Sequence, residues 1–264
     1  MIARWWLVPI VLLLVSGCSY PSFNVPAKEY RSKVRTLGVL PLLVDADSDI
    51  HHHQGAQVIS LLESHNRAAD MPLVEMLRNQ KGYFDVRLLR EDTRELFGQL
   101  VSGSQVSGQG AELRLDYDFR VDTAARLIDA HQVDALLVVV LHGIVRTERR
   151  WDRAALAVTY LDAPLNLVTV SAYVVDAQGG KLWQLSAERA GTFLDLQYPK
   201  FDEAYYNRSD QVATEYLRLE GLENALEVKS EQALPSETLA EPYWSLFRRI
   251  VADLDPGRPG LFRQ

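Results

Sequence analysis

The sequence predicts an α/β fold in which a mixed sheet is flanked by helices. Two apolar runs of strand length, residues 36–44 and 135–141, have the pattern of strands buried on both faces. Segments with helical spacing lie between these runs, an order typical of a sheet with helices packed on it. A glycine-containing turn at 176–180 joins two further strand-like segments, 165–175 and 181–188, and predicts an antiparallel hairpin that makes the sheet mixed.

Spacing and cap residues predict the other elements in chain order. Helical spacing begins near Val58 and breaks at residues 66–70. Asp70 is suited to the N-cap of a second helix with Pro72 in its first turn, and Gly82 is suited to the position after its end. The remaining predicted elements are a strand at 83–89 and amphipathic helices at 122–131, 209–226 and 236–254.

Residues 28–254 are predicted to form one domain, because neither an internal repeat nor a linker divides them. Residues 90–122 form a long insertion, and residues 255–264 read as an irregular tail. Within the insertion, the Gly/Ser-rich residues 102–110 have the composition of a flexible turn.

Residues 111–122 alternate apolar and charged side chains without a fault. In an extended strand the apolar set would share one face and the charged set the other. Two interpretations stay open: a strand with one face in the domain core, or a strand of a membrane-inserting hairpin with its apolar face toward lipid. The second needs a partner strand before the turn, and residues 94–101 alternate poorly.

The first 17 residues have the pattern of a secretion signal. Arg4 gives a positive start, and residues 7–15 form an apolar run that leads to Cys18, the one cysteine of the chain. This run is too short for a bilayer span, which takes about 20 residues, but it fits the core of a signal peptide. The ending VSGC, residues 15–18, resembles the bacterial lipobox, in which the cysteine is acylated and becomes the first residue of the mature protein.

Acylation of Cys18 would attach the mature chain to a membrane. Three acyl chains on one residue exceed the two signals that stable anchoring requires. Lipoproteins kept in the inner membrane commonly carry Asp after the cysteine, whereas this chain has Ser19. In a Gram-negative host we therefore expect the periplasmic face of the outer membrane. Residues 18–27, which include Pro21 and Pro26, are expected to form a short irregular tether.

The charge of the chain limits its partners. The formal net charge is −7, and removal of Arg4 with the signal makes it one unit more negative. The basic residues form no cluster suited to nucleic acid or to anionic lipid. Nucleic acid is therefore not an expected partner, and membrane attachment is expected through Cys18 alone. With Cys18 acylated, no thiol remains for a disulfide, a metal or nucleophilic catalysis.

A run of acids and histidines follows the first predicted strand. Asp45, Asp47, Asp49, His51 and His53 fall at every second position, so an extended backbone would align them along one edge. Carboxylates with imidazoles can hold zinc or copper, although the spacing departs from a calcium loop. A solvated loop explains the same residues, so both interpretations stay open, and no metal or cofactor is assigned.

Three segments together resemble the periplasmic α/β domain shared by curli-secretion lipoproteins, TolB amino-terminal domains and lipoprotein activators of penicillin-binding proteins. These segments are residues 36–42, 122–143 and 170–191. The last contains the hairpin residues that carry the resemblance, namely Asp176, Gly179, Gly180 and Trp183. The resemblance implies a three-layer sandwich like the TolB amino-terminal domain, with inserted segments and C-terminal helices, and an accessory or assembly role in the cell envelope.

We expect no enzyme, because the chain has no G-x-S-x-G elbow and no glycine-rich phosphate loop, and no carboxylate pair is selected by spacing. The expected function is that of a non-enzymatic, membrane-anchored periplasmic lipoprotein that binds an unidentified envelope protein or complex. One alternative is a self-assembling, oligomeric secretion or transport component with membrane strands in residues 90–122. A second alternative is a periplasmic hydrolase or metal-binding protein.

Overall fold

A computed structural model describes residues 22–80, 82–110, 113–151, 160–185, 190–201, 212–230 and 239–255. The strands are β1 Thr36–Val39, β2 Leu43–Asp45, β3 Asp85–Leu88, β4 Val101–Ser107, β5 Arg114–Phe119, β6 Ala135–Trp151, β7 Tyr160–Val175, β8 Lys181–Gln184, β9 Leu194–Asp195, β10 Gln197–Pro199 and β11 Thr214–Tyr216. The six helices in these ranges are α2 Ala27–Lys33, α3 Gly55–Asn79, α4 Thr93–Leu100, α5 Val121–His131, α8 Leu219–Glu227 and α9 Glu241–Asp253.

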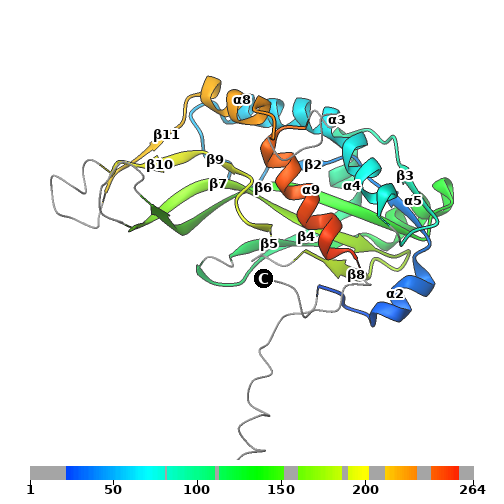
Figure 1. Ribbon diagram of the computed structural model, residues 1–264. Coiled ribbons are helices and arrows are strands. Elements are labelled where there is room, and N and C mark those ends of the chain that lie inside the picture. The colour runs from blue at the N-terminus through cyan, green and yellow to red at the C-terminus, as the bar shows by residue number, and fades with distance from the viewer. Residues whose placement is uncertain are drawn as a thin grey trace, which may run out of the picture.

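The predicted α/β class and mixed sheet are confirmed. The main sheet has seven strands in the order β3-β1-β6-β7-β8, with β2 paired to β6 and β9 paired to β7 (Figure 1). Strand β1 runs parallel to both β3 and β6, whereas the pairs β6–β7 and β7–β8 are antiparallel. Two further strand pairs, β4–β5 and β10–β11, lie outside this sheet.

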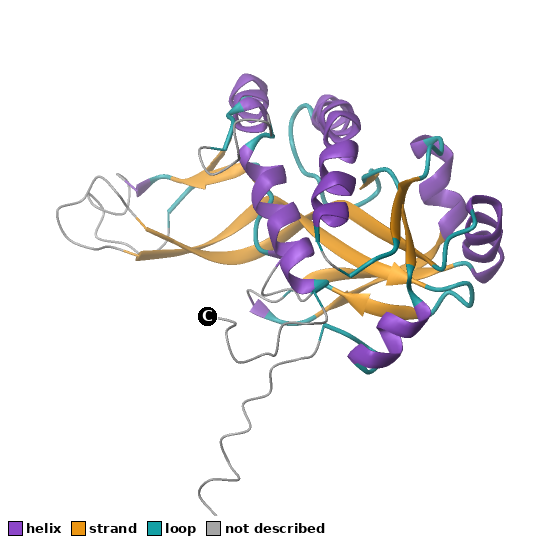
Figure 2. Ribbon diagram, turned by 45° about the vertical axis from the view of Figure 1, so that its right-hand side comes forward, coloured by secondary structure: helices purple, strands orange, loops and turns teal. Residues whose placement is uncertain are grey.

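Strands β6 and β7 continue well past the predicted segments 135–141 and 165–175, and the pair extends beyond the helices (Figures 1 and 2). The extension is polar as well as apolar. Arg149 lies opposite Asp162 in the register, and its guanidinium donates to both carboxylate oxygens at 2.8 and 2.9 Å. Such cross-strand pairs stabilise a ladder where the apolar pattern has ended.

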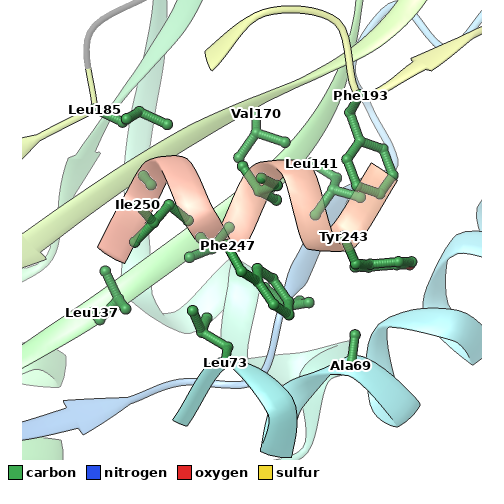
Figure 3. Packing of buried hydrophobic residues seen from close by; sticks show 14 of the residues in the cluster. Ala69, Leu73, Leu137, Leu141, Val170, Leu185, Phe193, Tyr243, Phe247 and Ile250 are labelled. Carbon is green, nitrogen blue, oxygen red and sulfur yellow. The ribbon is translucent and has the colours of Figure 1, made fainter. Parts of the chain in front are cut away.

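Side chains of β6 divide the core into two parts, one on each face of the sheet. Leu137 and Leu141 belong to a cluster with α3 and α9, and Figure 3 shows the side chain of Phe247 between α9 and Leu73 of α3. Leu136, Val138 and Val140 belong to a second cluster with α4, α5 and the β4–β5 pair. Strands with apolar residues on both faces need cover on both, which the helices provide.

The predicted break in the first helix was wrong, because α3 is continuous and contains Pro72. Asp70 is not an N-cap. Its carboxylate accepts the backbone N–H of Leu42 at 2.9 Å, and it is 8% exposed. Leu73 and Leu77 are fully buried on the same helix, and their packing offsets the helix hydrogen bond that Pro72 removes.

The segment that donates this hydrogen bond was also predicted incorrectly. Residues 36–44 form two short strands, β1 and β2, separated at Leu40–Leu42 around Pro41. Proline has no N–H for a ladder, so the chain leaves β1 there and rejoins the sheet beside β6.

Two segments of the insertion differ from their predictions. Residues 94–101, considered as a partner strand, lie mostly in α4, which Asp92 caps by accepting the N–H of Arg94 at 3.0 Å. The predicted turn at 102–110 is largely strand β4, paired antiparallel with β5.

In the C-terminal part, the predicted helix 209–226 is strand β11 followed by α8, with residues 209–211 outside the described ranges.

The described chain begins on the edge strand β8. Phe23 forms a β-bridge with Trp183, and Asn24 donates its backbone N–H to Leu182 at 3.0 Å. Cys18 and the predicted signal lie outside the described residues. Within the ranges that are described, no helix combines the length and the apolar character that crossing a membrane requires.

Candidate functional site

The acids and histidines after the first strand do not meet at one point. Asp45 is buried, Asp49 pairs with His51 at 3.3 Å, and His53 packs edge-on against Tyr216 at 4.8 Å between ring centroids. Among the described residues, no three His, Cys, Asp or Glu side chains are grouped as a metal site requires. The alternation in sequence is therefore not an alignment in space, because the chain turns at 46–47 instead of staying extended.

Asp45 belongs to a buried polar cluster beneath β5. The hydroxyl of Tyr117 donates to Asp45 at 2.8 Å, and Nε2 of His142 lies 3.1 Å from the hydroxyl oxygen of Ser171. Ser171 in turn donates to the carbonyl of Leu115. Burial lowers the pKa of His142 to about 4, so its imidazole is neutral at physiological pH. These bonds hold β5 against the sheet. The apolar side chains of β5, which the membrane-hairpin interpretation would place in lipid, are therefore packed in the domain core.

A crevice of 540 Å³ opens beyond the carboxyl ends of β1 and β3. Pro41, which follows β1, lines it together with residues 88–94, which follow β3. The helix after β1 and β2 is α3, which packs on one face of the sheet, whereas α4 follows β3 and packs on the other. Adjacent parallel strands whose helices go to opposite faces leave such a crevice, the usual ligand position in open α/β sheets.

One wall of the crevice is a face of α3. Glu63, Arg67 and Asp70 line it, with the spacing that brings side chains onto one side of a helix. Asp70 is the deepest of the three by exposure, and its one described hydrogen bond is the N–H of Leu42. Burial raises the pKa of Asp70 to about 6, and the bond from Leu42 lowers it in part. This wall therefore holds a desolvated carboxylate that makes no ion pair with a described residue, although Arg67 lines the same wall.

The opposite wall is the loop between β3 and α4 with the first turn of that helix. Its acids are occupied within the chain: Glu91 pairs with His131 at 2.7 Å, and Asp92 caps the helix. The guanidinium groups of this wall have no such partner. Arg90 and Arg94 make no ion pair with a described residue, and both are exposed. The charged groups on this wall that have no described partner are therefore the two guanidinium groups.

Replacement of Asp70 by Asn is expected to change how stability depends on pH. The folded-state pKa lies above the value of 3.8 for an unperturbed Asp, so the contribution of Asp70 is full below about pH 4 and is lost as the pH rises through about 6. Asn keeps an acceptor for Leu42 but does not titrate. We expect the free energy of unfolding of Asp70→Asn to rise by about 2–3 kcal/mol relative to wild type between pH 4 and pH 7, measured by urea unfolding.

The control for this measurement is Asp47→Asn, which changes an exposed carboxylate in the same part of the chain. Its stability should follow the wild-type curve at every pH. Parallel curves for Asp70→Asn and wild type would show that Asp70 is not a desolvated acid.

Sequence reasoning missed this crevice. It treated Asp70 as a helix cap and residues 90–94 as the start of an insertion. The signal that was present is the charged run of residues 90–95 directly after an apolar strand, together with the acids and base at helical spacing on α3. These two groups of residues meet because β3 pairs with β1 in the sheet, and that pairing could not be predicted from the sequence.

No protein-family model matches the chain, and no curated protein is similar to it. Among solved structures, a neuraminyllactose-binding hemagglutinin homologue from Helicobacter pylori is similar with a TM-score of 0.39 and 7% sequence identity, over 84% of this chain and 86% of that chain. At this level of similarity, no residue role is transferred to this chain.

Proposed function

We propose that this protein is lipidated on Cys18, is held on the periplasmic face of the outer membrane and acts without catalysis, as an accessory or assembly factor that binds an envelope partner. The observation that carries the proposal is the sequence VSGC at 15–18, which ends an apolar run of signal-peptide length at the one cysteine of the chain. Acyl chains on that residue supply the attachment.

The start of the described chain supports a domain that lies close to its anchor. Ser22 follows Cys18 by four residues, which span at most about 14 Å when fully extended. The next residue, Phe23, is bridged to Trp183 on β8. In this proposal the β8 edge of the sheet is therefore nearest the membrane.

The crevice is then on the far side of the sheet from the anchor. Strand β3 forms the opposite edge, and the order β3-β1-β6-β7-β8 separates the two edges by roughly 19 Å at ordinary strand spacing. A crevice between β1 and β3 is accessible from the periplasm in this arrangement. We take it as the site where the partner binds.

We also propose that the fold is a three-layer sandwich of the TolB amino-terminal kind. Helices on both faces of the sheet support this assignment, as do the turn residues that carry the resemblance. The carboxylate of Asp176 accepts the N–H of Gly180 at 2.8 Å, and Gly179 has a φ of +73°, which glycine adopts without strain. Trp183 then enters the core with no exposed surface.

Fractionation of a Gram-negative host that expresses the full chain tests the anchor. Wild type is expected in the outer-membrane fraction, with acyl chains on the N-terminal peptide by mass spectrometry. Cys18→Ala is expected in the soluble periplasm, because the proposal assigns membrane attachment to the acyl chains of that residue. A Cys18→Ala protein that stays with the membrane would overturn the proposal.

Ser19→Asp is the matched variant for the destination. It leaves Cys18 in place, so acylation should persist while the protein moves to the inner-membrane fraction. An unchanged outer-membrane location would contradict the assigned sorting signal, without affecting the result for Cys18→Ala.

A further inference from the structure

Each wall of the crevice carries charged side chains that make no ion pair with a described residue. On the α3 wall, Asp70 is buried with only a backbone donor, and no described side chain bonds to the carboxylate of Glu63. On the loop wall, Arg90 and Arg94 have no described acidic partner, because the acids beside them bond elsewhere in the chain. Two other surface arginines, Arg87 and Arg149, are by contrast paired with carboxylates.

This arrangement discriminates against simple ions. A lone anion at Arg90 and Arg94 would leave the buried carboxylate of Asp70 unpaired, and a lone cation at Asp70 would make no contact with the exposed guanidinium groups. An unpaired buried charge is costly, whereas a guanidinium and a carboxylate form strong bidentate bonds. A ligand with a positive and a negative end satisfies both walls together.

We propose that the crevice binds a short peptide with free ends, its ammonium group against Asp70 and Glu63 and its terminal carboxylate against Arg90 and Arg94. The volume of 540 Å³ is within the range of small-ligand sites and admits a chain of a few small residues. Arg67 lies between the two acids on α3, where it can donate to peptide carbonyls. This inference names the ligand chemistry of the site in the proposed function, and its test is independent of the anchor.

Calorimetric titration of the full-length protein in mild detergent tests the assignment with three probes. Tri-alanine has both charged ends. N-acetyl-tri-alanine keeps only the carboxylate, and tri-alanine amide keeps only the ammonium group. We expect measurable binding of tri-alanine, and binding of each blocked peptide that is weaker by about tenfold or more, as the loss of one charge-assisted bond predicts.

Two variants assign the ends to their walls. Asp70→Asn should remove the preference for tri-alanine over its N-acetyl form, and Arg94→Gln should remove the preference over the amide. Asp47→Asn and Arg218→Gln alter exposed residues outside the crevice and should leave all three affinities unchanged.

Three results would overturn the inference: no binding of any probe, equal binding of all three, or full discrimination retained in both crevice variants. A protein that fails these tests but is released by Cys18→Ala would still be an anchored lipoprotein. The two proposals can therefore fail separately.

Discussion

Gly143→Ala should destabilise the protein by about 3 kcal/mol, although it adds a single methyl group. Gly143 lies in β6 directly under the loop after β2, and its N–H donates to the hydroxyl of Ser48 at 2.9 Å. A Cβ at this position would overlap the backbone of Asp49 and Ile50. Backbone cannot rotate away as a side chain can, so either the loop or the strand must move. Urea unfolding at constant pH gives the free-energy difference.

Gly98→Ala is the matched control, because it makes the same chemical change in an open position. Gly98 lies within α4, and nothing within 4 Å would meet its Cβ. Alanine in a helix is favoured over glycine by about 0.5–1 kcal/mol, so this variant should be slightly more stable than wild type. Opposite signs for the two substitutions are expected, and a neutral Gly143→Ala would show that the loop is not packed on β6.

Trp183→Ala should cost about 4 kcal/mol of unfolding free energy. Trp183 has no exposed surface, and its indole N–H donates to the carboxylate of Asp253 at 3.1 Å, which ties β8 to the end of α9. The substitution removes a large buried ring and a donor to a buried acid. Trp183→Phe keeps most of the ring and should cost about 1–2 kcal/mol for the lost hydrogen bond.

Trp244→Phe separates the hydrogen bond from the change in ring size. Trp244 packs against the same core, but its buried indole N–H has no partner among the described atoms. The same substitution there removes no hydrogen bond, so it should cost clearly less than Trp183→Phe. Equal losses at the two positions would assign the effect to ring volume alone.

Strands β6 and β7 and helix α5 were predictable because their patterns are local. Every residue of 135–141 is apolar, and residues 122–131 carry one apolar stripe, so the class of each element follows from the sequence. The lengths of β6 and β7 were not predictable. Their extension depends on pairs such as Arg149 with Asp162, which are visible only when the register is known.

Asp70 shows why the crevice could not be predicted. An Asp two residues before a proline is a good local signal for a helix start, and that signal is wrong here because Asp70 bonds to Leu42, far away in sequence. Likewise, the glycines and serines of residues 102–110 predict a turn, but most of this segment pairs with β5 as strand β4. Local propensity was overridden by tertiary contacts in both cases.

The pairing of β1 has a consequence for how the chain reaches its native state. Thr36 at the start of β1 donates its N–H to Asp134, 98 residues later, whereas β6 and β7 are joined as one hairpin. Local contacts close rapidly and distant ones slowly, so we expect the β6–β7 hairpin to form early and β1 to enter the sheet late. A chain secreted from its N-terminus, as proposed, delivers the apolar residues of β1 to the periplasm well before β6 emerges. The nascent chain is therefore most prone to aggregation during that interval, because the apolar residues of β1 are exposed and available to a periplasmic chaperone.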